Sequence, residues 1–335
     1  MNRVQEAVRS SRSDQVVAGR RGLTLPGLWA FVAVFLPVIA ALRATLSSID
    51  LAYQIRAGDL MLRTHHLIRT DTFTFTAHGR PWLDQQWGAQ IVLAWVYRLG
   101  GWPGLAVLRA GLVGLIFVFV FLACRAAGTA LRTSAWLTLA SFAVIVGGLS
   151  LRPQLIGMAL FAITVWVVFD RRRHPARLWW IPPIVAVWAN VHGSFFLAPV
   201  LLGLAWLEDR SERAPGPSRT LLIGAVSVVA ATLNPFGLKV WSYAVGISSN
   251  PEITKFVTEW QPPTVRDFAG AAFFVSVAAV VGILAMRGRK TPWPALLSLG
   301  TFFAIGLFAV RGIFWWAMVA PRSSRTRSLA PTNHV

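Results

Sequence analysis

Acidic side chains gather in one polar stretch, which runs from Ile49 to Trp87 and is the longest polar segment between apolar ones. It holds four of the thirteen acidic residues, namely Asp50, Asp59, Asp71 and Asp84. A carboxylate beside a hydroxyl nucleophile can take its proton as a general base, and nearby cations can hold a departing phosphate. This stretch is therefore the first candidate for an active site, and the rest of the chain must position it.

The composition indicates a polytopic membrane protein. Hydrophobic residues make up 55% of the 335, charged residues only 13%, and the mean hydropathy is +0.58. Apolar stretches of roughly 17 to 25 residues, the length of a membrane-crossing helix, recur from Leu23 to Ala320. We expect an all-α transmembrane helical bundle of about nine or ten spans over residues 23–320.

The formal charge of +19 suggests either nucleic-acid binding or membrane topology, and the positions of the charges decide between them. Most of the 32 basic residues lie near the two termini and in short loops between apolar segments. Such loops stay in the cytoplasm by the positive-inside rule. We expect a plasma (inner) membrane protein with no nucleic-acid partner, a cytoplasmic basic tail at 1–22 and a second basic tail at 321–335.

This topology places residues 47–103 in a large first outer loop that carries two surface helices, and residues 234–267 in a second outer loop. Leu51 to Leu62 is typical of an amphipathic helix that is too polar to cross the bilayer. Gln85 to Leu99 is a second, Trp- and Tyr-rich candidate that ends at two glycines.

Arg109 follows in the apolar segment that re-enters the membrane after these glycines. A charge at membrane depth normally faces the interior of a helical bundle. We therefore expect Arg109 to meet an acidic or a carbonyl partner.

The same assignment sorts polar residues to one side of the membrane. The residues placed at outward helix ends and breaks are Asp50, Asp84, Arg152, Gln154, Asn190, His192, Asn234, Glu259 and Arg311. The inner loops carry little besides arginines and linker residues. An outward-facing enzyme or binding site explains this sorting, whereas a passive anchor does not.

Several short motifs resemble one family. Asp50 and Tyr53 form D-x-x-Y at the end of the first span, and Pro81 to Asp84 form P-W-x-D before the second surface helix. The later strings LRPQLIGMALF, WANVHGSFF, LNPFGLKVW and EWQPP add to the pattern. Over most of its length the chain resembles the polytopic GT-C glycosyltransferases, above all the protein mannosyltransferase and lipid A aminoarabinose transferase branch and its uncharacterised bacterial relatives.

The resemblance implies transfer of a sugar from a polyprenyl-phosphate carrier to an acceptor on the outer membrane face. Asp50 matches the first-loop acid of the family and would act as general base. Asp84 stands near the second conserved position and would orient the acceptor or stabilise positive charge at the sugar. The chain departs from the aminoarabinose type, which often pairs two acids where Ile49 and Asp50 stand and has Lys where Gln85 stands here.

The residue chemistry agrees with this expectation. Arg152 and Arg311 are the best cations for a departing phosphate, because a guanidinium can hold phosphate through two hydrogen bonds. The expected substrate- and carrier-binding residues are Tyr53, Arg152, Gln154, Asn190, His192, Asn234, Glu259 and Arg311. We expect no metal ligands and identify no cofactor, since His65 and His66 are adjacent and lack ligand spacing. Besides the bilayer and the lipid-linked sugar, the acceptor is unknown.

Each assignment has a structural alternative. Asp50 and Asp84 can each cap the helix that follows, His192 can be a satisfied helix-end histidine, and Arg152 can be an interfacial anchor. For the whole chain, a transporter or flippase of a lipid-linked or small polar substrate stays open. So does a noncatalytic, truncated GT-C-like membrane protein.

Overall fold

The computed structural model describes residues 24–46, 50–287 and 291–321. Throughout these ranges every regular element is a helix, and the pairing of Thr70 with Pro81 is an isolated antiparallel bridge. The predicted tail 1–22 and all but the first residue of the predicted tail 321–335 lie outside the described residues. The all-α class expected from the sequence is confirmed.

The α-helices follow one another along the chain. They are α2 (Leu25–Arg43), α3 (Leu51–Thr64), α4 (Trp87–Ala126), α5 (Leu131–Ile145), α6 (Pro153–Asp170), α7 (Ile181–Ala189), α8 (Leu197–Ser211), α9 (Pro217–Ala230), α10 (Lys239–Ser249), α11 (Pro251–Phe256), α12 (Phe268–Arg287), α13 (Trp293–Phe308) and α14 (Ile313–Val319). The 3₁₀ segments are η1 (Val146–Gly148), η2 (Pro175–Trp180), η3 (Gly193–Phe196), η4 (Thr258–Trp260) and η6 (Val310–Gly312). Most of the α-helices that follow one another along the chain are joined by short turns or 3₁₀ segments, but a long loop over residues 65–86 joins α3 to α4.

Five of the described helical stretches are long and apolar enough to cross a bilayer, which makes the chain a membrane protein. They are α2, α4, α5 extended by η1, α6 and α12. The other apolar helices are shorter than the sequence windows suggested, because prolines and turns divide them. For example, α7 has nine residues, and prolines occupy its first turn.

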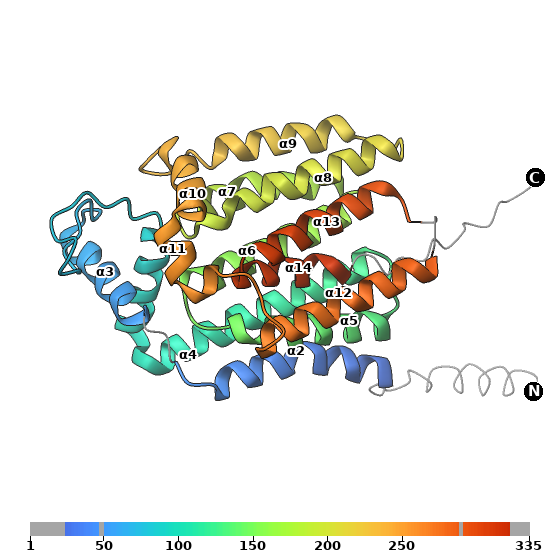
Figure 1. Cartoon of the computed structure of the whole chain (residues 1–335), viewed down its shortest axis with the longest axis horizontal. Helices are drawn as coiled ribbons and strands as arrows, with labels where there is room; N and C mark the ends of the chain where they lie inside the picture. Colours follow the sequence, from blue (N-terminus) through green and yellow to red (C-terminus); the bar gives the residue numbers. More distant parts are fainter. Residues whose placement is uncertain (1–23, 47–49, 288–290, 322–335) are drawn as a thin grey trace, which may run out of the picture.

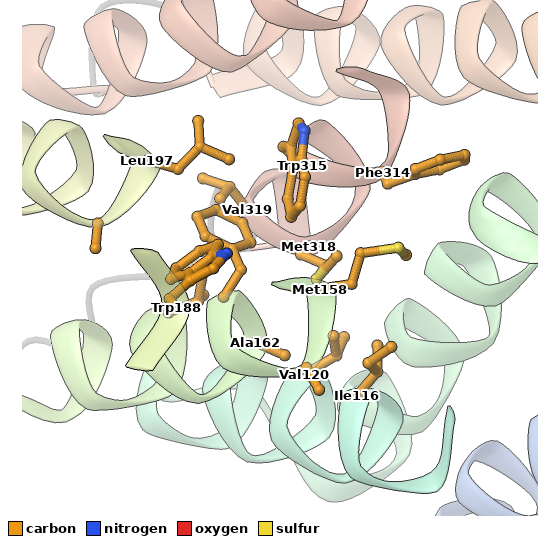
Figure 2. Close-up of a cluster of buried hydrophobic side chains, with 14 of the residues drawn as sticks. Ile116, Val120, Met158, Ala162, Trp188, Leu197, Phe314, Trp315, Met318 and Val319 are labelled. Atoms are coloured by element: carbon orange, nitrogen blue, oxygen red, sulfur yellow. The ribbon is translucent and has the colours of Figure 1, made fainter. Parts of the chain in front are cut away.

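The core is formed where α4, α6, α7, α8 and α14 meet (Figure 2). Within the 18-residue apolar window of each helix, 72% of α6 is buried, against 17% of α2 and 11% of α12. The helix α6 is therefore the centre of the bundle, and α2 and α12 are peripheral. The labelled core side chains are Ile116, Val120, Met158, Ala162, Trp188, Leu197, Phe314, Trp315, Met318 and Val319.

The helix α4 combines two segments that the sequence separated. Its 40 residues run through a kink at Gly101, whose φ of 57° lies in the left-handed region open to glycine. Pro103 follows two residues later. The predicted second surface helix therefore begins at Trp87 instead of Gln85, and it bends into the membrane segment at the predicted glycines.

Arg109 has the carbonyl partners that the sequence required. Its guanidinium donates to the carbonyl oxygen of Thr45 over 2.8 Å and also to those of Ala41 and Ala44. These carbonyls belong to the C-terminal end of α2, whose last peptide groups lack partners within the helix. Arg109 therefore binds α2 to α4 from inside the bundle.

The long helices run side by side, with α3, α10 and α11 together at one end of them (Figure 1). The C-terminal end of α8 and the start of α9 lie at the other end. There, buried Arg171 donates to Glu208 and Asp209, each over 2.8 Å. The segments expected to face inward therefore carry paired acids as well as arginines, because Glu208, Asp209 and Glu212 bind the arginines that follow α6.

Candidate functional site

Asp50 lies immediately before α3 and makes no capping hydrogen bond with its side chain. Its carboxylate instead lies 3.7 Å from the Nε of Arg152, measured from Oδ2. The side chain is 49% exposed, so a group outside the bundle can reach it. The capping alternative for Asp50 is wrong, and the residue belongs to a charged network.

This network joins four charged side chains from distant parts of the sequence. Arg152, just before α6, donates through Nη1 to Glu259 Oε1 in η4. Arg311 in η6 donates through Nη2 to Glu259 Oε2 over 2.8 Å. One carboxylate therefore holds two guanidinium groups, and Arg152 extends the chain to Asp50. Arg152 is thus more than an interfacial anchor.

The two arginines also set the charge state of Glu259. Its burial favours the neutral acid, but the charges of Arg311 and Arg152 outweigh this effect and hold the pKa of Glu259 below its usual value. The ring of Trp260 lies 4.7 Å from the Cζ of Arg311, a cation–π contact that fixes the guanidinium from its other side. Glu259 is therefore ionised at neutral pH, and Trp260 and Glu259 hold the guanidinium of Arg311 between them.

Two adjoining cavities border this network. The smaller, of about 100 Å³, is lined by Arg152, Gln154, Glu259 and Arg311 together with residues near η1 and α14. The larger, of about 400 Å³, falls in the size range of small-molecule sites. Gln154 and Arg311 line both cavities, so the charged network lies at one edge of the larger one.

The larger cavity has an apolar interior and a polar edge. Its apolar wall comes from α10, α13 and α14, with Ile247, Ile305, Phe308 and Trp315. The polar groups include Gln85, Gln86, Ser194 and Tyr243, which the sequence did not single out as site residues. Gln85 and Gln86 follow the P-W-x-D motif directly, so their position beside Asp84 was a usable signal. Tyr243 and Trp315 sit in apolar segments and gave none.

Gln154 and Arg311 each have one buried nitrogen donor that makes no hydrogen bond within the described residues. The two atoms are Gln154 Nε2 and Arg311 Nε. Buried donors without a partner cost free energy, so such groups normally meet a ligand or water. Both belong to residues shared by the two cavities, and an anion is the ligand that suits them.

His192 lines the larger cavity, where it is held by Ser194. Its Nδ1 lies 2.7 Å from Ser194 Oγ and accepts a hydrogen bond from the Ser194 backbone N–H over 3.2 Å. Burial, and secondarily the charge of Arg311, lowers the pKa of His192 to about 3. The ring is therefore neutral, and its Nδ1 is already engaged by Ser194, so only Nε2 can present an N–H to the cavity. This supports the structural alternative for His192, a satisfied histidine at a helix end.

Asp84 directly precedes Gln85 and Gln86, which line the larger cavity, and Tyr53 is a partly exposed residue of α3. Asp84 is only 3% exposed, accepts from Gln90 Nε2 over 2.9 Å, and lines neither cavity. Burial raises the pKa of Asp84 to about 7, although hydrogen bonds oppose the shift. Burial, with the charges of Asp84 and Asp50, also raises the pKa of Tyr53 well above its usual value. Tyr53 lines neither cavity, and its hydroxyl accepts from Gln54 Nε2 over 2.9 Å.

Asn190 and Asn234 line neither cavity and hold the surrounding turns together. Asn190 Nδ2 donates to the Leu233 carbonyl oxygen over 2.9 Å, and its Oδ1 accepts from Trp87 Nε1 over 2.9 Å. Asn234 Nδ2 donates to the Ala189 carbonyl oxygen over 2.8 Å. The structure thus gives the two asparagines positioning roles between α4, α7 and the turn before α10.

Among the described residues, no group of three or more His, Cys, Asp or Glu side chains is arranged to hold a metal ion. His65 and His66 are exposed at the end of α3. The site defined so far therefore consists of an apolar cavity, two arginines and two carboxylates at one end of a helical membrane bundle.

Comparison with known proteins finds no family model, curated protein or solved structure that matches this chain.

Proposed function

We propose that the protein is a membrane glycosyltransferase that moves a sugar from a polyprenyl-phosphate carrier to an acceptor on the outer face of the plasma membrane. The observation that supports this most is the joining of the Asp50–Arg152–Glu259–Arg311 network to an apolar cavity. A lipid-linked sugar needs both parts, because its chain is apolar and its phosphate is anionic.

In this proposal, Asp50 is the general base. The acceptor hydroxyl attacks the anomeric carbon of the sugar, and its proton passes to the Asp50 carboxylate. The bond between that carbon and the phosphate oxygen breaks, and the carrier leaves as polyprenyl phosphate. Neither Asp50 nor Asp84 lines a cavity, but Asp50 suits this role better because it is half exposed and pairs with Arg152, whereas Asp84 is buried.

Arg311 and Gln154 hold the departing phosphate. Charge builds on the phosphate oxygens as the bond breaks, and fixed donors stabilise it most where water is scarce. The free Nε of Arg311 and Nε2 of Gln154 are available for this without breaking the ion pairs to Glu259. Glu259 and Arg152 link the guanidinium of Arg311, which lines the cavity, to the carboxylate of Asp50.

The topology belongs to the same proposal. We place the end with α3, α10 and α11 outside and the N-terminus in the cytoplasm, in agreement with the loops rich in arginine. The shorter helices α7, α8, α9, α13 and α14 then complete about nine or ten crossings as broken or short spans. Labelling of single cysteines at Thr74 and Arg213 from the two sides of sealed vesicles tests this arrangement.

The transfer reaction is tested with purified protein in vesicles that contain a polyprenyl-phosphate-linked, radiolabelled sugar and a panel of acceptors. We expect Asp50→Asn to reduce the transfer rate by at least a hundredfold, within the usual contribution of a general base. Asp71→Asn is the matched control, because Asp71 lies in the same loop and bonds only to nearby groups such as Thr74. Transfer at the parental rate by Asp50→Asn contradicts the assignment of the base.

A flippase for the same carrier is the second candidate, because the cavity and Arg311 would also suit a lipid phosphate that is moved without chemistry. The Asp50→Asn variant separates the two functions. A flippase retains translocation of a fluorescent lipid-linked sugar in this variant and forms no glycosylated product in the parent.

A further inference from the structure

A buried polar cluster lies where α3 meets the beginning of α4. It consists of Gln54 on α3, Asp84 before α4, and Gln90 in the second turn of α4, which are 3%, 3% and 0% exposed. The two helices touch directly here, because a Cβ on Gly58 would lie 2.0 Å from the Gln90 carbonyl oxygen. Nothing in the proposed transfer reaction uses this cluster.

Each of the three side chains leaves one oxygen without a partner. Gln54 Oε1, Asp84 Oδ2 and Gln90 Oε1 are buried and accept no hydrogen bond from the described residues. When Asp84 is ionised, the atom of Gln90 that faces Asp84 Oδ1 at 2.9 Å is its donor nitrogen, which leaves Gln90 Oε1 as an acceptor. Buried acceptors of this kind require a donor or a cation.

The carboxyl group of Asp84 and the amide group of Gln90 are in direct contact. Gln90 Nε2 and Asp84 Oδ1 form the hydrogen bond between the two groups. The other terminal atom of each group, Gln90 Oε1 and Asp84 Oδ2, is the one without a partner in the described part of the chain. Gln54 is linked to the residue just before α4, because its Nε2 donates to Gln86 Oε1 over 3.0 Å as well as to the Tyr53 hydroxyl over 2.9 Å. Gln85 Oε1 is also unpartnered, but it lies towards Gly193 in the cavity and so belongs elsewhere.

The charge of the cluster indicates which ligand it suits. Carboxylate and amide oxygens are ligands for hard cations. Asp84 makes no ion pair with any basic residue of the described chain, and its burial makes an uncompensated charge costly. One positive charge neutralises this site, whereas a divalent ion would leave a buried excess charge.

We propose that Gln54, Asp84 and Gln90 bind one monovalent hard cation of the Na⁺ type between α3 and α4. The ion ties the beginning of α4 to α3, the helix that starts at Asp50. It is thus a structural ion that holds the outer helix in place. This inference is independent of the transfer reaction, because binding can be measured whether or not any sugar is moved.

The full chain in nanodiscs tests the proposal through its thermal unfolding midpoint in NaCl and in choline chloride at equal ionic strength. We expect a saturable rise in the midpoint with Na⁺ that is absent in Asp84→Asn and retained in the control Asp71→Asn. An equal midpoint in both salts, or a Na⁺ response that persists in Asp84→Asn, overturns the proposal. Saturation by CaCl₂ at a lower concentration than by NaCl overturns the monovalent assignment.

Equilibrium dialysis with ²²Na⁺ gives a second measurement that does not depend on the folding of Asp84→Asn. We expect about one ion per parental chain, and at least a tenfold weaker affinity in Gln90→Leu, which removes one ligand and the hydrogen bond to Asp84. Absence of bound ²²Na⁺ in the folded parent shows that the oxygens meet only water or a proton, and it overturns the proposal.

Discussion

Arg311 Nη2 donates to Glu259 Oε2 over 2.8 Å, although 52 residues separate the two in the sequence. The other oxygen of Glu259 holds Arg152. The pair therefore orients Arg311, a cavity-lining residue whose buried Nε has no hydrogen-bond partner among the described residues. In the proposed function this relationship prepares Arg311 to hold a phosphate, whereas in a simple surface ion pair every donor faces water.

Arg311→Lys is expected to weaken the binding of polyprenyl phosphate about tenfold. A lysine keeps the charge but loses the fork of donors, and one charge-assisted hydrogen bond contributes about 1.5 kcal/mol or more. Binding is measured with a fluorescent polyprenyl phosphate and protein in nanodiscs. Arg266→Lys is the control, since Arg266 is exposed and outside both cavities. Equal affinity of Arg311→Lys and the parent would show that Arg311 does not hold the phosphate.

His192 is expected to make the fold sensitive to mild acid. Its pKa is about 3 in the folded chain and about 6.5 in the unfolded one, so below pH 6.5 the unfolded state binds the extra proton. The contribution of His192 to stability is therefore complete above pH 6.5 and is lost as the pH falls towards 3, by at most about 1.4 kcal/mol per pH unit.

This prediction is checked by following the free energy of unfolding of the parent and of His192→Gln from pH 7.5 to pH 4.5. The amide of glutamine cannot take up a proton, so the difference between the two proteins should shrink as the pH falls. Parallel pH profiles would contradict the prediction, because they would mean that His192 does not contribute to the acid sensitivity.

The sequence predicted the charged part of the site well for a physical reason. In a chain so rich in apolar residues, each charge must lie at a membrane surface or inside the bundle with a partner. Asp50, Arg152, Glu259 and Arg311 therefore stood out, and the structure brings them together. Arg109 followed the same rule, and its predicted carbonyl partners are confirmed.

Two other parts of the site could not be found in this way. Aromatic residues such as Tyr243 and Trp315 face the cavity, but in sequence they resemble the many lipid-facing and core aromatics. Asparagines at helix breaks bind backbone carbonyls as readily as ligands, so Asn190 and Asn234 looked like site residues. The count of long helices also differed, because hydropathy windows do not show where a helix ends within an apolar run.

Arg109→Met is expected to destabilise the fold by about 2 to 4 kcal/mol. The substitution removes the donors of the carbonyl groups at the end of α2 and leaves those groups buried without partners. The midpoint of unfolding by sodium dodecyl sulfate in mixed micelles measures the effect. Arg132→Met should change it little, since Arg132 is exposed near the start of α5. Equal midpoints for both variants would show that Arg109 is not needed to anchor α2.

Gly58→Ala is expected to push α3 away from α4. A Cβ at Gly58 would lie 2.0 Å from the Gln90 carbonyl oxygen and 2.8 Å from the Ala94 Cβ, so the helices cannot keep their present spacing. Overpacking of this kind costs about 1 to 3 kcal/mol, which exceeds the gain of somewhat less than 1 kcal/mol from the better helix propensity of alanine.

Gly111→Ala provides the matched control, because a Cβ there has no atom within 4 Å and the residue lies on an exposed face of α4. We expect Gly111→Ala to be neutral or slightly stabilising and Gly58→Ala to unfold at a lower temperature. Since α3 begins next to Asp50, its displacement also changes the 3.7 Å approach of Asp50 to Arg152. Gly58→Ala should therefore lower transfer activity as well as the unfolding temperature, relative to Gly111→Ala. If both the activity and the unfolding temperature of Gly58→Ala matched those of Gly111→Ala, the close packing of α3 on α4 would be contradicted.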